Sequence, residues 1–416
     1  MPRYPRLLAS LRSGVWLSPE RVTGYLRLLI LTNLLGLTLA ICRAHGWFLP
    51  PEPHFSIEFM SFYAAGKLVN AGTPALVYAP GIPLSAYIDS LHITPFHWAM
   101  QQRISGDPKI VNFSFFYPPV YWLLCAPLAY LGFYPAFFTW ITLTFAFLLA
   151  ALRRIAGRWQ LLWPILAYLP VIKNAAVGEN AFLSTALLAF GLLHLERRPY
   201  LAGLFFGGLC YKPHFLLPVG ILLLAGLQWR AILTAALSAA TLCLAAAVLY
   251  GWQPWIDYFT IAVPHAAWAF RHGGFSYAIQ VTPFSALRLL GGSLPLADAA
   301  QTLTALFAAL SLIFAASRAT PNIRAAVLAA SFPLLCSVML DYDYALTGLA
   351  ILFLALEAQR TGFLPWEKSA LAALFALPLL TLALRTQLHL PLDPLVPIAF
   401  IALLCQRIRL TPAQIS

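Results

Sequence analysis

YLRLLILTNLLGLTLAIC, residues 25–42, is an apolar run long enough to cross a lipid bilayer as a helix. The basic segment MPRYPRLLASLRSGVW precedes it, and no small-residue cleavage site follows it. A removed signal peptide would carry such a site, so the run predicts a retained first transmembrane helix. Similar segments recur along the chain and bring the expected number of spans to about 12, with both chain ends in the cytoplasm. The later segments cover residues 134–152, 159–173, 181–195, 200–212, 214–226, 231–251, 297–317, 324–340, 344–357, 367–384 and 394–405.

The composition of the 416-residue chain is that of an integral membrane protein. Hydrophobic residues make up 61% and charged residues 10%, whereas soluble domains carry about 25% charged residues. Solid apolar runs favour helices over a spanning β-barrel, whose strands alternate. We therefore predict an all-α polytopic membrane protein that forms one integral-membrane domain over residues 1–416. The six cysteines show no CxxC or His-linked spacing, so we expect no disulfide framework, metal or cofactor.

The formal net charge of +12 comes mostly from arginines in short loops and at the chain ends. Cytoplasmic loops of membrane proteins are enriched in Lys and Arg, so these residues indicate orientation and not nucleic acid binding. They place the N-terminus (1–24) and the tail (406–416) in the cytoplasm, and two long loops (45–116 and 252–296) outside. The expected cytoplasmic loops contain Arg153, Arg154, Arg158, Arg197, Arg198, Arg230, Arg318, Arg324, Arg360, Arg407 and Arg409.

The Pro-bracketed segment 117–131 admits two topologies. In the first it dips into the membrane or lies flat, which keeps the arginines of residues 153–158 inside. In the second it crosses the membrane and leaves those arginines outside, which violates the positive-inside rule. We favour the first. It makes residues 200–226 a hairpin with Lys212 at its outer tip.

SIEFMSFYAAGKLVNAGTPALVY, residues 56–78, follows the first apolar run. Its pattern predicts a short amphipathic helix at the membrane face that ends at Gly72. Glu58 would lie in the first turn, where the positive end of the helix dipole favours an ionised carboxylate. Glu58 could also be a solvated helix-end acid without a chemical role.

The favoured topology brings several polar residues to the outer face, although they are far apart in the sequence. Ionisable groups next to membrane segments are expensive and are usually functional. Their convergence predicts a single external site. It comprises Glu58, Tyr117, Glu179, Lys212, the 252–296 loop, Asp341 and Asp343.

Each of these residues also has a purely structural interpretation. Glu179 could end a helix, and Asp341 and Asp343 could be a helix-end acid pair. Lys212 and His214 flank a proline between apolar runs, where a lysine needs an anion, carbonyl groups or water. In the 252–296 loop, the aromatic residues suit interfacial anchoring or sugar stacking, and Arg271 with His272 could bind a phosphate. We find no Walker loop, GxGxxG, HExxH or nucleophile elbow.

An ordered set of motifs resembles glycosyltransferase family 87, a group of bacterial membrane glycosyltransferases, over roughly residues 55–355. The motifs are EFMSFYAAGKLVNAGTPALVY, FFYPPVYWLLCAPLAYL, GENAFLSTALLAFGLLHLERRPYLAGLFFGGLCYKPHF, GWQPWIDY and LDYDYALTGLAIL.

The resemblance implies a GT-C fold in the bacterial inner membrane with a periplasmic active site. The donor would be a polyprenyl-phosphate sugar, typically of mannose, and the sugar would pass with inversion to a lipid-linked or polymeric acceptor. The essential carboxylate of the family lies in an Asp-Phe motif, which here reads Glu58-Phe59. The usual Gly-Gln-Asn reads Gly178-Glu179-Asn180. Lys212, His214, Arg271 and His272 would bind the donor phosphate, and Tyr63, Tyr117, Glu179, Asn180, Asp341 and Asp343 complete the candidate site.

Two other functions remain compatible with the sequence. A lipid or sugar flippase or transporter would need a path through the membrane and binding groups at its midplane. A catalytically silent scaffold of the same fold is permitted by the two departures from the family motifs.

Overall fold

A computed structural model describes residues 4–43, 57–79, 95–108, 110, 113–157 and 162–410. In this part of the chain the regular structure is helical, apart from an isolated antiparallel bridge between Gln280 and Leu340. The all-α prediction is therefore confirmed for the described residues. Much of the predicted outer loop 45–116, Arg158 and most of the tail lie outside them.

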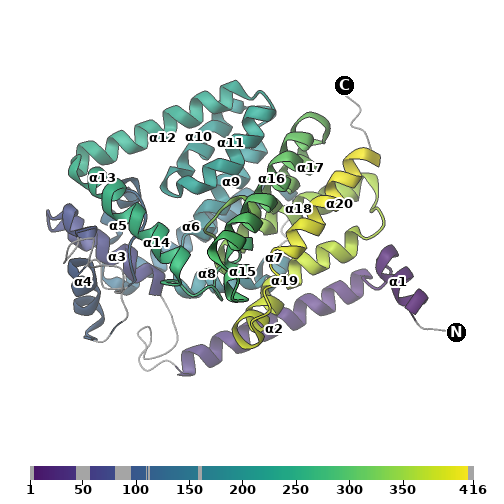
Figure 1. The fold of residues 1–416 in the computed structure, drawn as a ribbon, viewed down its shortest axis with the longest axis horizontal. Coiled ribbons are helices and arrows are strands. Elements are labelled where there is room, and N and C mark those ends of the chain that lie inside the picture. Colours follow the sequence, from purple (N-terminus) through teal and green to yellow (C-terminus); the bar gives the residue numbers. More distant parts are fainter. Residues whose placement is uncertain are drawn as a thin grey trace.

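Five helices of the described chain are long and apolar enough to cross a membrane, judged by length and composition (Figure 1). They are α2 (Pro19–Arg43), α6 (Phe133–Ala156), α12 (Trp229–Tyr250), α16 (Leu294–Arg318) and α19 (Glu367–Leu388). Apolar helical segments of 10–17 residues accompany them. The expected number of about 12 spans is not reached by this criterion and stays a prediction.

The other predicted apolar segments coincide with helices that are mostly shorter. These are α9 (Ala181–His194), α10 (Pro199–Gly207), α11 (Leu216–Ala225), α17 (Pro321–Leu335), α18 (Tyr344–Thr361) and α20 (Leu395–Leu410). The predicted segment 159–173 is divided into α7 (Leu162–Ala167) and α8 (Leu169–Val177). Pro170 favours a helix start there, because a residue in the first turn needs no N–H partner.

Segment 117–131 forms a short 3₁₀ turn (Pro119–Tyr121) and α5 (Trp122–Leu128). At 1.5 Å per residue, α5 reaches about a third of the way across a hydrocarbon core. This length is compatible with the first of the two topologies, and the topology of the segment stays a prediction. It packs against α3 (Ile57–Asn70), where a Cβ on Gly66 would lie 2.3 Å from the Cys125 carbonyl oxygen.

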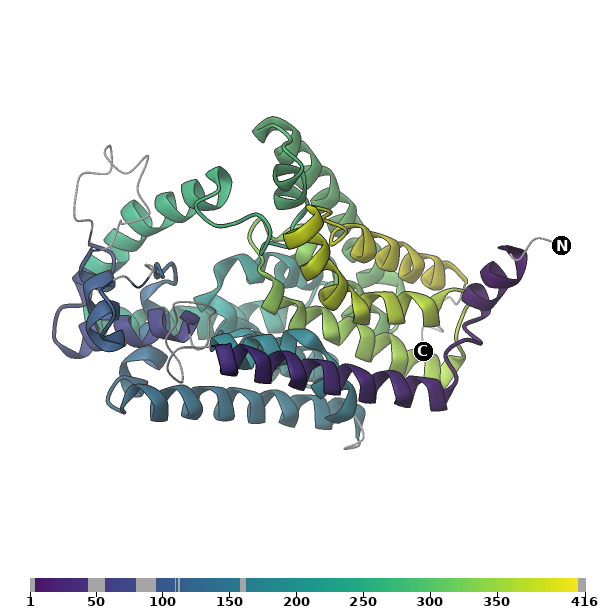
Figure 2. The same ribbon diagram turned by 90° about the horizontal axis from the view of Figure 1, so that it is seen from below.

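The helix ends gather at two opposite ends of the bundle. Both chain termini lie at the right of Figure 1, whereas α3, α5, α4 (Pro95–Ser105) and α13 (Gln253–Asp257) lie at the left. We call these the terminal end and the site end. Figure 2 shows α2 and α6 running between them.

The predicted cytoplasmic loops meet at the terminal end. Glu196 pairs with Arg324, and Arg407 pairs with Glu367. Cation–π contacts at this end join Arg230 to Tyr200, and both Arg318 and Arg409 to Phe314. Hydrogen bonds join Thr320 to Glu357, Arg407 to Thr361, and the Trp366 backbone N–H to the Arg12 carbonyl. The basic loops thus share one end of the molecule, which is consistent with the prediction from the positive-inside rule.

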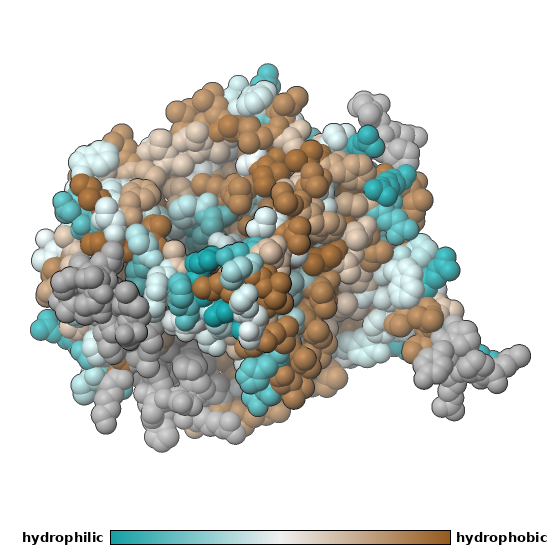
Figure 3. Space-filling model, in the orientation of Figure 1, coloured by the Kyte–Doolittle hydropathy of each residue, from teal (hydrophilic) through white to brown (hydrophobic). Residues whose placement is uncertain are grey.

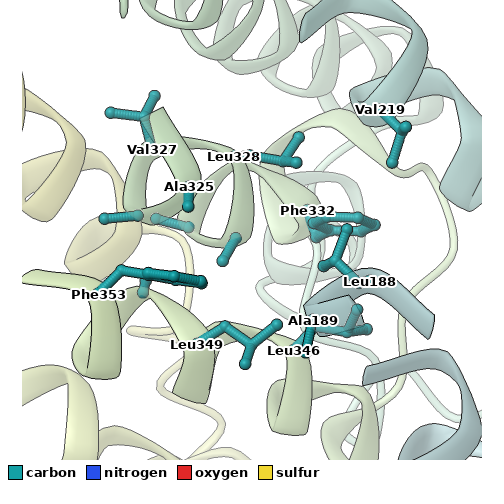
Figure 4. Close-up of a cluster of buried hydrophobic side chains, with 14 of the residues drawn as sticks. Leu188, Ala189, Val219, Ala325, Val327, Leu328, Phe332, Leu346, Leu349 and Phe353 are labelled. Carbon is teal, nitrogen blue, oxygen red and sulfur yellow. The ribbon is translucent and has the colours of Figure 1, made fainter. Parts of the chain in front are cut away.

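The core is built around α17, which is buried along most of its length (Figure 4). Phe332 packs edge-on against Phe215, and α17 also packs against α18, which carries Leu346 and Phe353. Small residues allow the membrane helices to approach closely. The tightest example is Gly203 of α10, where a Cβ would lie 1.9 Å from Thr234 Oγ1 of α12.

The outer faces of the long helices expose apolar side chains (Figure 3). Val248 of α12 is 76% exposed and Leu303 of α16 is 68% exposed. Soluble monomers rarely expose large contiguous apolar patches. These faces are therefore suited to contact lipid.

Candidate active site

The site end holds a cluster of ionisable side chains drawn from six separate parts of the chain. Hydrogen bonds, ion pairs and electrostatic interactions connect its members. We call it the ionisable cluster. It comprises Glu58, Lys173, Glu179, Lys212, Asp341, Asp343, Arg385 and Asp393.

Glu179 is fixed in the wall of the site by its neighbours. It follows Gly178, whose φ of +80° is left-handed and whose Cβ position is closed off by Phe59 and Phe137. Glu179 Oε1 accepts hydrogen bonds from Tyr117 Oη (2.7 Å) and Tyr342 Oη (3.1 Å), and only 1% of the residue is exposed. These contacts hold the Glu179 carboxyl group in one position beside the site.

Lys212 lies where the chain turns from α10 into α11. Its Nζ donates to Asp343 Oδ1 (2.9 Å) and lies 3.9 Å from Glu179 Oε2. The aromatic rings of Tyr117, Phe215 and Tyr342 surround the ammonium group at 5.1–5.9 Å. Burial alone would lower the pKa of Lys212, but the two carboxylates outweigh it and raise that pKa.

Asp343 is the main partner of Lys212. It lies in the short 3₁₀ turn Asp341–Asp343 that precedes α18. Burial raises the pKa of Asp343 to about 6, against the lowering influence of Lys212. The pair is therefore a buried ion pair whose two partners depend on each other.

A second pair of acids is bridged by Arg385 of α19. Its Nη2 lies 3.7 Å from Asp341 Oδ2 and its Nε lies 3.3 Å from Asp393 Oδ2. Arg385 Nη1 also donates to the Gln280 carbonyl (2.9 Å). Lys173 of α8 donates to the same Oδ2 of Asp341. Asp341 thus has two cationic neighbours.

Glu58 lies in the first turn of α3, as predicted, and its side chain is partly exposed. Burial and the charge of Glu179 raise the pKa of Glu58 to about 8, although Lys212 and Lys173 act to lower it. The expected effect of the helix N-terminus is therefore outweighed. A carboxyl group with a pKa near neutral pH is well matched to accept a proton during a reaction.

The structure brings together most of the predicted site residues but not all of them. Tyr117 and Asp341 join the ionisable cluster directly, and Asn180 is buried beside it at the start of α9. His214 is partly buried next to Lys212, with its ring against Phe215.

Tyr63, Arg271 and His272 make other contacts. Tyr63 Oη donates to the Leu131 carbonyl (2.7 Å) and so ties α3 to the start of α6. Arg271 forms a bidentate pair with Asp298 at 2.7 and 2.8 Å. His272 stacks on Trp268. We find no contact that joins these three residues to the ionisable cluster within the described chain.

The sequence analysis missed Lys173, Arg385, Tyr342 and Asp393 as site residues. A signal was present for two of them, because Lys173 and Arg385 interrupt apolar segments and ionisable residues there are usually functional. Tyr342 was quoted only as part of a motif. Asp393 carries no local signal, since its role depends on Arg385 in another helix.

Comparison with known proteins gives a match to a family profile but none to an individual protein. Neither the curated proteins nor the solved structures include a significant match to the chain. Among the described residues, His, Cys, Asp and Glu form no group of three that could hold a metal ion. The sequence profile described as Glycosyltransferase family 87 matches residues 115–338, which is more than half of the chain. The chain therefore belongs to glycosyltransferase family 87.

Proposed function

We propose that this membrane glycosyltransferase moves a hexose from a polyprenyl-phosphate sugar to an acceptor hydroxyl. The hexose is mannose, as the family resemblance implies. The acceptor is a lipid-linked or polymeric saccharide, and the anomeric configuration inverts. The observation that carries the proposal is the ionisable cluster at one end of an apolar helical bundle, with Glu58 partly exposed beside the fixed Glu179. A transporter site would instead be expected near the midplane.

Glu58 acts as the general base in this proposal. It accepts the proton of the acceptor hydroxyl from about 2.6–3.2 Å. The hydroxyl oxygen attacks the anomeric carbon from the face opposite the phosphate, and the bond between that carbon and the phosphate oxygen breaks. Polyprenyl phosphate leaves with the electron pair, so the product has inverted configuration. Burial and the neighbouring Glu179 raise the pKa of Glu58, which favours proton transfer.

The lipid chain of the donor has a candidate site among the membrane helices. An apolar cavity of about 190 Å³ lies between α6, α7, α8, α9, α18 and α19. Val171, Thr185 and Ala345 line it, and they are close in sequence to Lys173, Glu179 and Asp343. An isoprenoid chain suits such a lining, because it offers only apolar surface for burial.

We propose that the site end faces the periplasm, because the basic loops share the opposite end. Lys212 and Asp343 are too buried to report this by chemical labelling. The exposed residues Arg154 and His272 are suitable reporters. In a variant without the native cysteines, an impermeant maleimide added outside intact spheroplasts should label His272→Cys and not Arg154→Cys. Permeabilised cells provide the control, since both variants should then react. Outside labelling of Arg154→Cys would contradict the orientation.

The direct test of the function is turnover by purified protein in lipid nanodiscs. Polyprenyl-phosphate mannose, glucose and galactose are each supplied with a panel of lipid-linked and soluble saccharide acceptors. We expect release of polyprenyl phosphate and a lengthened acceptor with at least one donor, and none with nucleotide sugars. Failure with every donor, together with intact folding, would favour the silent scaffold.

A further inference from the structure

The three cations of the ionisable cluster differ in their freedom to meet a ligand. Lys212 and Arg385 have side chains that are 5% and 1% exposed. The Lys173 side chain is 26% exposed. Lys173 is therefore the most accessible cation of the cluster.

Lys173 is not only accessible but also close enough to the proposed base, Glu58, to act on it electrostatically. Lys173 acts electrostatically on Glu58 and lowers its pKa, as Lys212 does. An anion that binds Lys173 would therefore lie close to Glu58. The same short helix, α8, carries both Lys173 and Val171, and Val171 lines the apolar cavity.

We propose that Lys173 binds the phosphate of the polyprenyl-phosphate donor, an inference that rests on the proposed function. Lys173 is favoured over Lys212 because of the carboxylate that each lysine would leave when it turns toward a phosphate. When Lys173 turns toward a phosphate, Asp341 keeps Arg385 as a cationic neighbour at 3.7 Å. When Lys212 turns away, Asp343 loses the cation to which it is paired among the described residues. A buried carboxylate without a cation is costly.

Arg271 is a poorer choice than Lys173 for the same ligand. Both of its terminal nitrogens donate to Asp298, and its guanidinium lies over the Phe284 ring at 5.5 Å. A phosphate would have to displace this bidentate carboxylate. Nothing among its described contacts brings Arg271 to Glu58.

Direct binding of polyprenyl phosphate to the full-length protein tests the inference. Lys173→Met should raise the Kd for polyprenyl phosphate by about 10- to 100-fold, because a charge-assisted hydrogen bond is lost. The Kd for polyprenol, which has no phosphate, should stay unchanged. Lys173→Arg should retain most of the phosphate affinity. Lys67→Met is the matched control, since Lys67 lies on α3 over the Tyr63 ring and outside the cluster.

Three results would overturn the inference. They are an unchanged Kd for polyprenyl phosphate in folded Lys173→Met, an equal loss for polyprenol, and an equal loss in the Lys67 control. Failure of the proposed function gives a different pattern, in which the parent binds polyprenyl phosphate through Lys173 but transfers no sugar from any donor.

Discussion

Glu58→Gln is expected to lower turnover by about 10²- to 10⁴-fold, the usual contribution of a general base, with donor binding unchanged. The amide has nearly the shape of the carboxyl group but cannot accept the proton. Glu58→Asp, which restores the residue typical of the family, should keep substantial activity. Turnover and donor affinity are measured separately on the same preparations. A fully active Glu58→Gln variant would move the base elsewhere, with Glu179 and Asp343 as the next candidates.

The pH profile offers an independent check on Glu58. Its pKa is raised to about 8, so the carboxyl group is mostly protonated at pH 6, and the fraction in the ionised, basic form increases as the pH rises toward 8. We expect kcat/KM to rise over that interval, since this parameter reports the free enzyme. Glu179 is one cause of the raised pKa. Glu179→Gln should therefore shift the rising limb to lower pH in whatever activity remains.

Lys212→Met is expected to destabilise the fold by about 3–5 kcal/mol, because it breaks a buried ion pair and leaves charge uncompensated. Both side chains of the Lys212–Asp343 pair are nearly inaccessible, and Glu179 lies 3.9 Å from the same ammonium group.

A double variant separates the charge effect from packing. Asp343→Asn removes the orphaned carboxylate, so Lys212→Met combined with Asp343→Asn should recover part of the lost thermal stability. Lys67→Met serves as the matched control and should unfold like the parent. Equal unfolding temperatures for Lys212→Met and the parent would show that the pair contributes little.

The sequence was informative about the position of the helices because membrane length and basic loops leave strong local patterns. The break at Tyr168 was less visible, since one proline residue decides between one helix and two. For segment 117–131, the preference for a topology in which it does not cross was argued from charge alone. The number of spans depends on how short helices sit in lipid, and composition does not determine that.

The site was predicted where an ionisable residue stands alone in an apolar context, as at Lys212 and Glu179. Pairings between distant residues were beyond local patterns. An arginine such as Arg271 is a suitable ligand for a phosphate. Its guanidinium, however, donates to Asp298, which lies 27 positions later in the sequence. Tyr63 was a candidate site residue, yet its hydroxyl donates to a backbone carbonyl of the loop before α6.

The origin of the ionisable cluster in six parts of the chain has a consequence for biogenesis. Glu58 leaves the ribosome roughly 330 residues before Asp393, a delay of about 20–70 s at 5–20 residues per second. Within that interval Glu179 and Lys212 are made more than 100 residues before Asp343 and Arg385. The nascent protein must shelter these charges at the membrane surface until the later helices insert, and the ionisable cluster is complete only once Asp393 has been made.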